Sequence, residues 1–134
     1  MTFTFSDAWL LQSIFNCEND GAGADLRSII SFCDYTNHAI MSYAEFSLAL
    51  VKLKNIDMVK QHNYDLFTTQ NFKIWHFEMC KDKKRLLVHK ELAEIEKYLN
   101  ESFGKLEVDI KEFDTEIDEL DFSKAVNDYI SGAK

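Results

Sequence analysis

The chain has 134 residues, of which 46% are hydrophobic and 28% charged, and its net charge at pH 7 is −8. This length suits one domain with a real core and is short for two. The hydrophobic content, which includes eleven phenylalanines, excludes an intrinsically disordered chain. No apolar run approaches the roughly 18 residues that a membrane span needs, so we expect no membrane partner.

Two further features favour a cytoplasmic protein. The first nine residues lack the basic and apolar regions of a secretory signal. Three widely spaced cysteines, at positions 17, 33 and 80, suit buried thiols in a reducing compartment better than disulfides.

The negative charge is concentrated towards the end of the chain. Residues 107–121 contain eight acidic residues and one lysine, whereas residues 1–106 contain fourteen acidic and twelve basic residues. DNA-binding proteins usually present a basic surface, because phosphate contacts supply much of their affinity. The charge therefore weighs against strong DNA binding, although a local basic patch could still act.

Two helices are predicted in the first 35 residues. Ser6 can cap a helix that runs from Asp7 to about Cys17, and this helix is expected to be central. A polar loop at 19–23 then leads to a second helix over residues 24–34. The apolar residues at helical spacing are Ala8, Leu11, Ile14 and Phe15 in the first helix, and Leu26, Ile29, Ile30 and Cys33 in the second.

Residues 42–68 carry the clearest local signals. Ser42, followed three residues later by Glu45, forms a capping-box pattern that predicts a third helix ending near Asn55. Two short β-like runs follow, at 58–60 and 64–68. The helix has an apolar stripe of Phe46, Ala49, Leu50 and Leu53, and the predicted turn between the strands is Gln61, His62 and Asn63.

The rest of the chain is predicted to be mostly helical. Thr69 can start a fourth helix, a longer one runs from about Arg85 to Ser102, and Gly104 is a plausible stop. Residues 106–110 alternate apolar and charged residues, as in a short edge strand or an extended segment. We therefore expect a domain over residues 1–103. Residues 104–134 would form an acidic linker and a docking amphipathic helix at 122–130.

The fifth predicted helix has an apolar seam at heptad-like spacing, formed by Val88, Leu92, Ile95 and Leu99. One interpretation is that the seam packs on the protein's own core. The other is that it forms a homodimer, because a lone helix after a hairpin often needs a partner for its apolar side.

The order of three helices followed by a hairpin resembles a winged helix-turn-helix domain of the bacterial regulator type. MarR-type (multiple-antibiotic-resistance-type) and PadR-type regulators are the nearest broad relatives, over residues 5–103. In such domains a leucine ends the third helix, a turn follows, and two apolar residues open the wing. The matching residues here are Leu53, Asp57 where glycine is common, Met58 and Val59, with Phe67 and Thr68 closing the return strand.

The resemblance implies a mainly α fold with a small β-hairpin and additional C-terminal helices. It also implies a dimeric transcription regulator that binds double-stranded DNA. Helical phase places Tyr43, Ala44, Ser47, Leu48, Val51, Lys52 and Lys54 on the exposed face of the third helix. The residues expected at DNA are Tyr43, Ser47 and Lys52 from this helix, and Lys60, Gln61, His62 and Asn63 from the wing.

The third helix also departs from a DNA reader. Such helices usually expose arginine, lysine, asparagine or glutamine to base edges, but Leu48 and Val51 are poor base readers, and the helix contains no arginine. A second hypothesis is therefore a protein-interaction module without DNA binding. Tyr43, Leu48 and Val51 would then form an apolar contact patch.

Catalytic, metal and cofactor motifs are not apparent. The four histidines, at positions 38, 62, 76 and 89, do not pair with other ligands at metal-binding spacing. The four glycines form no phosphate loop or nucleophile elbow, so we expect no enzyme activity, metal or cofactor.

The basic run at 81–85 suits either phosphate contacts or a solvated helix junction. An aromatic group could line a ligand pocket, although core packing is favoured: Phe72, Trp75, His76 and Phe77.

Overall fold

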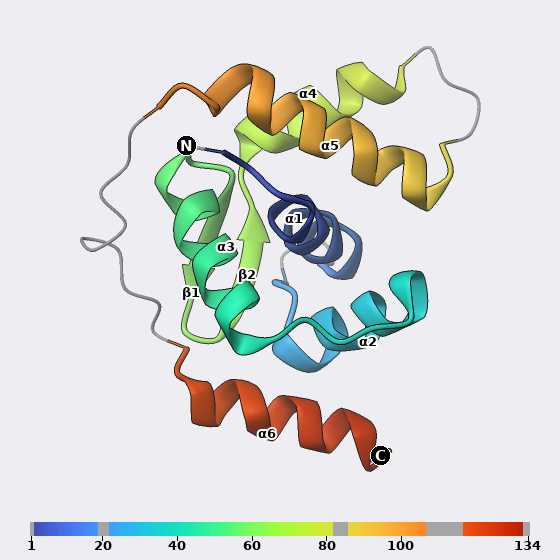
Figure 1. The fold of residues 1–134 in the computed structure, drawn as a ribbon, viewed down its shortest axis with the longest axis vertical. Helices are drawn as coiled ribbons and strands as arrows, with labels where there is room; N and C mark the ends of the chain where they lie inside the picture. Colours follow the sequence, from blue (N-terminus) through green and yellow to red (C-terminus); the bar gives the residue numbers. More distant parts are fainter. Residues whose placement is uncertain (1, 19–21, 82–85, 107–116, 133–134) are drawn as a thin grey trace.

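The computed structural model describes residues 2–18, 22–81, 86–106 and 117–132. Within these ranges the chain forms six helices and one antiparallel hairpin (Figure 1). The predicted fold class, mainly α with a small hairpin, is confirmed. The elements are α1 (Phe5–Cys17), α2 (Leu26–Asn37), α3 (Tyr43–Asn55), β1 (Val59–His62), β2 (Asp65–Thr68), α4 (Gln70–Cys80), α5 (Val88–Phe103) and α6 (Glu119–Ile130).

The first helix begins two residues earlier than predicted. Thr4, and not Ser6, is its N-cap residue, and its backbone N–H donates to Asp7 Oδ2 at 2.7 Å. The Ser6 hydroxyl instead donates to Glu45 Oε2 at 2.6 Å, which joins the start of α1 to the start of α3. The predicted cap was wrong because the partner of Ser6 lies in another helix.

The third helix and the fourth helix begin where their caps predict. Ser42 and Glu45 form both bonds of the capping box, and the Thr69 hydroxyl accepts the backbone N–H of Phe72. Helix α5 ends where predicted: Gly104 is its C-cap, and a Cβ at this position would collide with the carbonyl of Asn100. These signals are local, since each cap lies within four residues of its partner.

The hairpin is connected by a two-residue loop, Asn63 and Tyr64, because His62 pairs with Asp65 across β1 and β2. Gln61 and His62 therefore belong to β1 and not to the predicted turn. Asn63 has φ of +55°, a left-handed conformation that asparagine tolerates better than most residues.

The segment before α2 pairs with the hairpin. Ala24 and Leu66 exchange two backbone hydrogen bonds of 2.8 and 3.0 Å, so α2 begins at Leu26, two residues later than predicted. A Cβ at Gly23 would lie 2.8 Å from Asp65 Cβ, which explains a glycine at this close approach. The order α1-α2-α3-β1-β2 is compatible with a winged helix.

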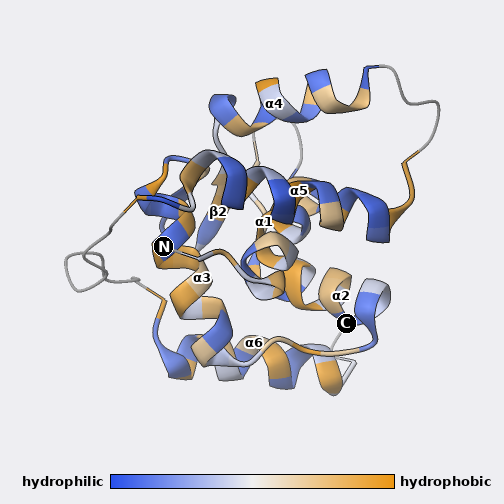
Figure 2. Cartoon of the chain, turned by 45° about the horizontal axis from the view of Figure 1, so that its top comes forward, coloured by the Kyte–Doolittle hydropathy of each residue, from blue (hydrophilic) through white to orange (hydrophobic). Residues whose placement is uncertain are grey.

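Helix α1 lies at the centre of the molecule and contacts α2, α3, α5 and β2 (Figure 1). Its residues from Asp7 to Ile14 are all buried, so the expected central position is confirmed. Figure 2 shows hydrophobic residues along α1 and on the helices around it. None of the described helices is long and apolar enough to cross a membrane.

The apolar seam of α5 packs on this same core. Leu92, Ile95 and Leu99 are buried and belong to the cluster that contains Leu11 and Ile14. The interpretation of an internal seam is thus confirmed for these three residues, and they are not open to a second chain. Val88, at the first turn of α5, is exposed.

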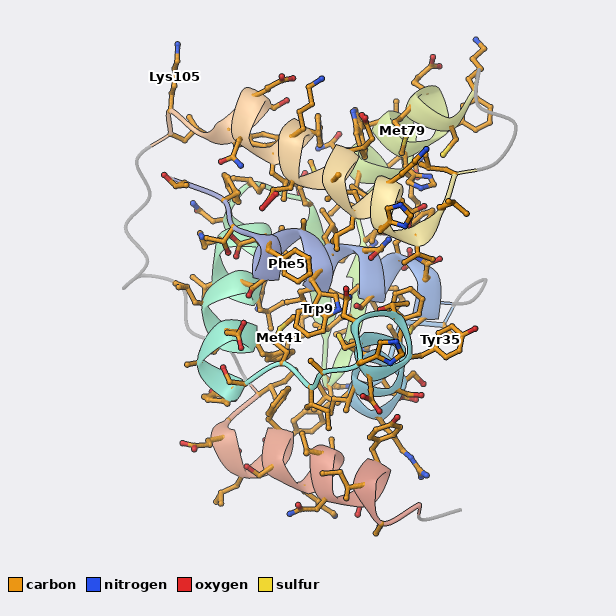
Figure 3. All side chains as sticks on the ribbon, turned by 45° about the vertical axis from the view of Figure 1, so that its right-hand side comes forward. Phe5, Trp9, Tyr35, Met41, Met79 and Lys105 are labelled. Carbon is orange, nitrogen blue, oxygen red and sulfur yellow. The ribbon has the colours of Figure 1, made fainter. Side chains whose placement is uncertain are left out.

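The last helix, α6, begins at Glu119 after an Asp118 N-cap, three residues before the predicted start. It lies alongside α2 and the beginning of α3 (Figures 1 and 3). Residues 107–116, which hold most of the predicted strand and acidic linker, lie outside the described residues, as do residues 82–85 of the basic run.

Candidate functional site

The face of α3 that was predicted to be open is only partly so. Ala44 is exposed, Leu48 is 46% exposed, and Ser47 is half-buried. Val51 and Lys52 are both buried, so the predicted exposure of these two residues was wrong. The apolar contact patch predicted from Tyr43, Leu48 and Val51 therefore retains only Leu48 as a well-exposed side chain.

Lys52 is turned inward, towards α1. Its Nζ donates to Asp7 Oδ2 at 2.6 Å and to the Thr2 carbonyl at 2.9 Å, and it lies 5.3 Å from the centre of the Phe3 ring. Both charged side chains are nearly excluded from solvent, at 6% and 2% exposure. A buried ammonium needs such partners. Lys52 therefore links α3 to α1 and is not placed to reach DNA.

The beginning of α3 is covered by α6. The Tyr43 hydroxyl donates to the carbonyl of Ile117 at 2.9 Å, just before α6 begins. The ring of Phe122 lies 5.7 Å from the ring of Tyr43 and 4.9 Å from that of Phe46. Tyr43 was expected at DNA or at a partner, but here it contacts the chain's own last helix.

A second hydrogen bond holds the other end of α6. The Tyr129 hydroxyl donates to Asp34 Oδ2 on α2 at 2.7 Å. This hydrogen bond, together with burial and the nearby negative charge, raises the pKa of Tyr129 above its ordinary value. Phe122 is buried and Val126 and Tyr129 are half-buried, as expected for a docking face, whereas Ile130 is exposed.

Three open pockets border α6. One of about 720 Å³ lies between its end and α2, where Phe32 and Tyr35 contribute to the wall. A second, of about 280 Å³, lies between Phe122 and Val126 of α6 and the turn between α2 and α3. A third, of about 210 Å³, lies on the side of Leu26 and is lined by Asp121, Lys124, Ala125 and Asp128 of α6.

The predicted wing residues lie together on the hairpin. Lys60, His62 and Asn63 are exposed, and Lys60 Nζ lies 5.7 Å from the centre of the Phe67 ring. Gln61 is engaged internally, since its side-chain oxygen accepts from Lys54 Nζ at 3.0 Å and its amide donates to the carbonyl of Asn63.

The aromatic residues of α4 pack mainly into the core. Phe72 is buried, and Trp75 stacks on Tyr98 with ring centres 4.3 Å apart. The ring centres of His76 and Phe15 are 4.2 Å apart. Phe77, by contrast, is exposed. These contacts agree with the favoured interpretation of core packing for Phe72, Trp75 and His76.

A polar cluster that the sequence did not indicate joins α1, α4 and α5. Glu91 accepts hydrogen bonds from Gln12 at 3.1 Å and Asn16 at 3.2 Å, and it lies 3.0 Å from His76 Nε2. Burial raises the pKa of Glu91, but the hydrogen bonds from His76, Gln12 and Asn16 outweigh burial, and the pKa is lowered. Glu91 is separated from Gln12, Asn16 and His76 by 79, 75 and 15 residues, so no local spacing could have indicated that they meet.

Cys80 lies near this cluster without the alignment of a nucleophile–base pair. Its Sγ is 3.9 Å from His76 Nδ1 and 3.8 Å from Nε2. Nearly equal distances place the sulfur off the axis of either ring nitrogen, whereas a nucleophile and its base share one directed hydrogen bond. Among the described residues, no group of three or more His, Cys, Asp or Glu side chains could hold a metal ion.

Comparison with known proteins finds no matching family model, no matching curated protein and no matching solved structure.

Proposed function

We propose that the chain is a cytoplasmic, non-catalytic protein-interaction module that uses the α2–α3 side of a winged-helix-like fold. The observation that carries this proposal is that α6 packs on the start of α3. The first turn of α3 binds this amphipathic helix through Tyr43, which contacts Phe122 and the carbonyl of Ile117. A surface that binds the apolar face of a helix is suited to protein contact, since aromatic and aliphatic anchors dominate such interfaces.

The distribution of charge supports the same proposal. Lys52, in the last turn of α3, is neutralised by Asp7, and the first turn of α6, beside the start of α3, carries Glu119 and Asp121. DNA binding depends on cations that replace the counterions of phosphates. An acidic helix beside the start of α3 opposes that contact.

A photo-crosslinking experiment tests the proposal. A benzophenone amino acid replaces Leu48, which is exposed on α3, in the cells that make the protein; the same probe at Phe77, exposed on α4 and outside the α2–α3 side, is the matched control. We expect crosslinked products from position 48 that contain a second polypeptide and resist nuclease. Products that disappear with nuclease would overturn the proposal.

A second candidate function is a dimeric, DNA-binding transcription regulator of the MarR-type or PadR-type. The observation that favours it is the order of three helices and a hairpin, with Ala24 paired to Leu66 beside the wing. In this case Ser47 would meet the major groove, and Lys60, His62 and Asn63 would lie at the backbone or the minor groove.

Fluorescence anisotropy with labelled mixed-sequence duplex DNA separates the two candidates. A DNA-binding protein binds even non-specific duplex at low salt, and its affinity falls steeply as salt rises. For the protein-interaction module we expect no binding at low salt. Salt-dependent binding that Lys60→Gln weakens uniformly, with a salt slope smaller by about 1, would establish the regulator instead.

A further inference from the structure

We propose that the α2–α3 surface is a binding groove for an amphipathic helix and that α6 is its resident intramolecular ligand. The partner is then a helix of the same chemistry, with aromatic, aliphatic and tyrosine anchors at positions i, i+4 and i+7. This inference deepens the proposed protein-interaction function and rests on it. The residues that form the groove, called the α6 groove below, are Leu26, Asp34, Ile40, Met41, Tyr43 and Phe46.

The anchors of the resident helix define what the groove recognises. Phe122, Val126 and Tyr129 are spaced at i, i+4 and i+7, so they form one stripe of α6. Phe122 inserts beside the rings of Tyr43 and Phe46. Val126 lines the pocket at the α2–α3 turn. The groove thus takes an aromatic side chain at one end and an aliphatic one at its middle.

Hydrogen bonds at the two ends set the position of the helix. At the start, the Tyr43 hydroxyl donates to a backbone carbonyl, that of Ile117. At the end, Asp34 accepts from the Tyr129 hydroxyl. The first contact requires only a backbone carbonyl before the helix, whereas the second requires a hydroxyl donor in the last turn of the helix. A partner helix therefore needs tyrosine, and phenylalanine at that position would leave the Asp34 carboxylate without this donor.

Helix α6 is suited to exchange with another helix. Phe122 is the one buried residue of α6, whereas α1 buries eight. Its other two anchors, Val126 and Tyr129, are only half-buried. Its outer side carries apolar residues in solvent, including Leu120 at 80% exposure. Elements with few buried contacts open at a lower free energy than the core, so α6 can leave while the packing around α1 persists.

The covalent connection between α6 and the rest of the chain determines how well a free helix can compete with α6 for the groove. A helix tethered to its own groove by a short connection has an effective concentration on the order of millimolar. A free helix of equal intrinsic affinity therefore competes poorly at micromolar concentration. Weakening the main anchor of α6 should open the groove to the same helix added as a separate peptide.

The experiment uses a fluorescent peptide with the sequence of residues 117–132 and three full-length chains. In Phe122→Asp the anchor is lost; Leu120→Asp adds the same charge on the exposed side of α6 and is the matched control. Anisotropy titrations should show at least ten-fold tighter peptide binding by Phe122→Asp than by the wild-type chain or Leu120→Asp. A peptide that itself carries Phe122→Asp should not bind.

Circular dichroism establishes that the Phe122→Asp chain is folded, and Val126→Asp serves as a second opened variant. Equal, weak binding by all folded chains would overturn the proposal. Native-state hydrogen exchange of the wild-type chain gives an independent readout: amides of α6 must exchange through openings of lower free energy than amides of α1, and equal protection of the two helices would also overturn it.

These outcomes are distinct from failure of the proposed function. Salt-dependent DNA binding by the wild-type chain would remove the protein-interaction function, whatever the peptide does. If the chain did not bind DNA and crosslinked to a protein through position 48, but failed to bind the peptide, only the proposal of the α6 groove would be rejected.

Discussion

The position of one lysine changes what the third helix can do. On a helical projection, Lys52 lies at the edge of the solvent face, and in the folded chain it meets Asp7 at 2.6 Å in a nearly dry environment. Such a pair is costly to desolvate and still more costly to break, because the remaining charge is left buried without a partner. Asp7 also accepts the backbone N–H of Thr4, so the pair and the start of α1 depend on the same carboxylate.

Replacing this lysine by methionine should therefore destabilise the protein strongly. We expect Lys52→Met to lower the free energy of unfolding by about 3–5 kcal/mol, measured by urea denaturation. Lys54→Met, which removes a half-buried lysine bonded to Gln61, is the control and should cost about 1 kcal/mol or less. Adding Asp7→Asn to Lys52→Met should recover part of the loss, since the uncompensated charge is gone. Equal costs for the two lysines would contradict a buried ion pair.

The cysteines of α1 and α2 should react slowly in the folded state. Burial is the main cause that raises the pKa of Cys17 to about 11, with contributions from Cys33 and Asp25, and burial also raises the pKa of Cys33 to about 11. Because the thiolate is the nucleophile, both thiols stay protonated and inert near neutral pH. Alkylation of Cys17 followed by mass spectrometry should accelerate about ten-fold per pH unit from pH 8 towards pH 10, provided the chain remains folded. Rapid, pH-independent labelling at Cys17 would contradict this prediction.

At the scale of elements, most local signals were predictable and distant partners were not. Ser42 with Glu45, Thr69 and Gly104 each act within their own helix, and each marked its boundary from the sequence. Two of the shifted starts involve partners elsewhere: Ser6 bonds to Glu45 on α3, and Ala24 pairs with Leu66. The third, the start of α6, has a local cap at Asp118 that was missed. Spacing along the chain carries no information about such contacts, so Ser6 was taken for the cap of α1 in place of Thr4, and the start of α2 was misplaced.

The apolar seam of α5 shows the same limit, because its period indicates a buried face and not the identity of the surface that buries it. Ile95 is fully buried in the cluster formed with α1. We expect Ile95→Ala to lower the free energy of unfolding by about 2–5 kcal/mol, whereas Val88→Ala, at an exposed position of the same helix, should cost under about 1 kcal/mol. Denaturation at several protein concentrations checks the cause: a midpoint that rises with concentration would indicate that the seam is buried between two chains.

The candidate site belongs to the scale of the whole molecule, which explains how little of it could be predicted. Docking of a last amphipathic helix follows from the spacing of Phe122, Val126 and Tyr129. Its position over the start of α3 does not, because Tyr43 and Asp34 are separated from their partners by 74 and 95 residues. The exposed face of α3 was therefore assigned from helical phase alone, without the helix that covers it or the α1 residue that neutralises Lys52.

The polar cluster of Glu91 joins three helices and should make the whole fold sensitive to acid. The pKa of Glu91 is lowered from 4.5 in the folded chain, so the folded state favours the ionised form. The resulting stability is fully present above pH 4.5, and it is lost as pH falls through the lowered value. Glu91→Gln should therefore flatten the loss of stability as the pH falls below 4.5.

Urea denaturation of both chains across this pH range measures the difference. Glu101→Gln, at an exposed position of the same helix, is the matched control and should keep the wild-type slope. If Glu91→Gln lost stability with acid as steeply as the wild-type chain, the bonds from Gln12, Asn16 and His76 would not favour the ionised carboxylate. The acid sensitivity would then have to arise at other carboxylates, and the junction of α1, α4 and α5 would owe its stability to apolar packing alone.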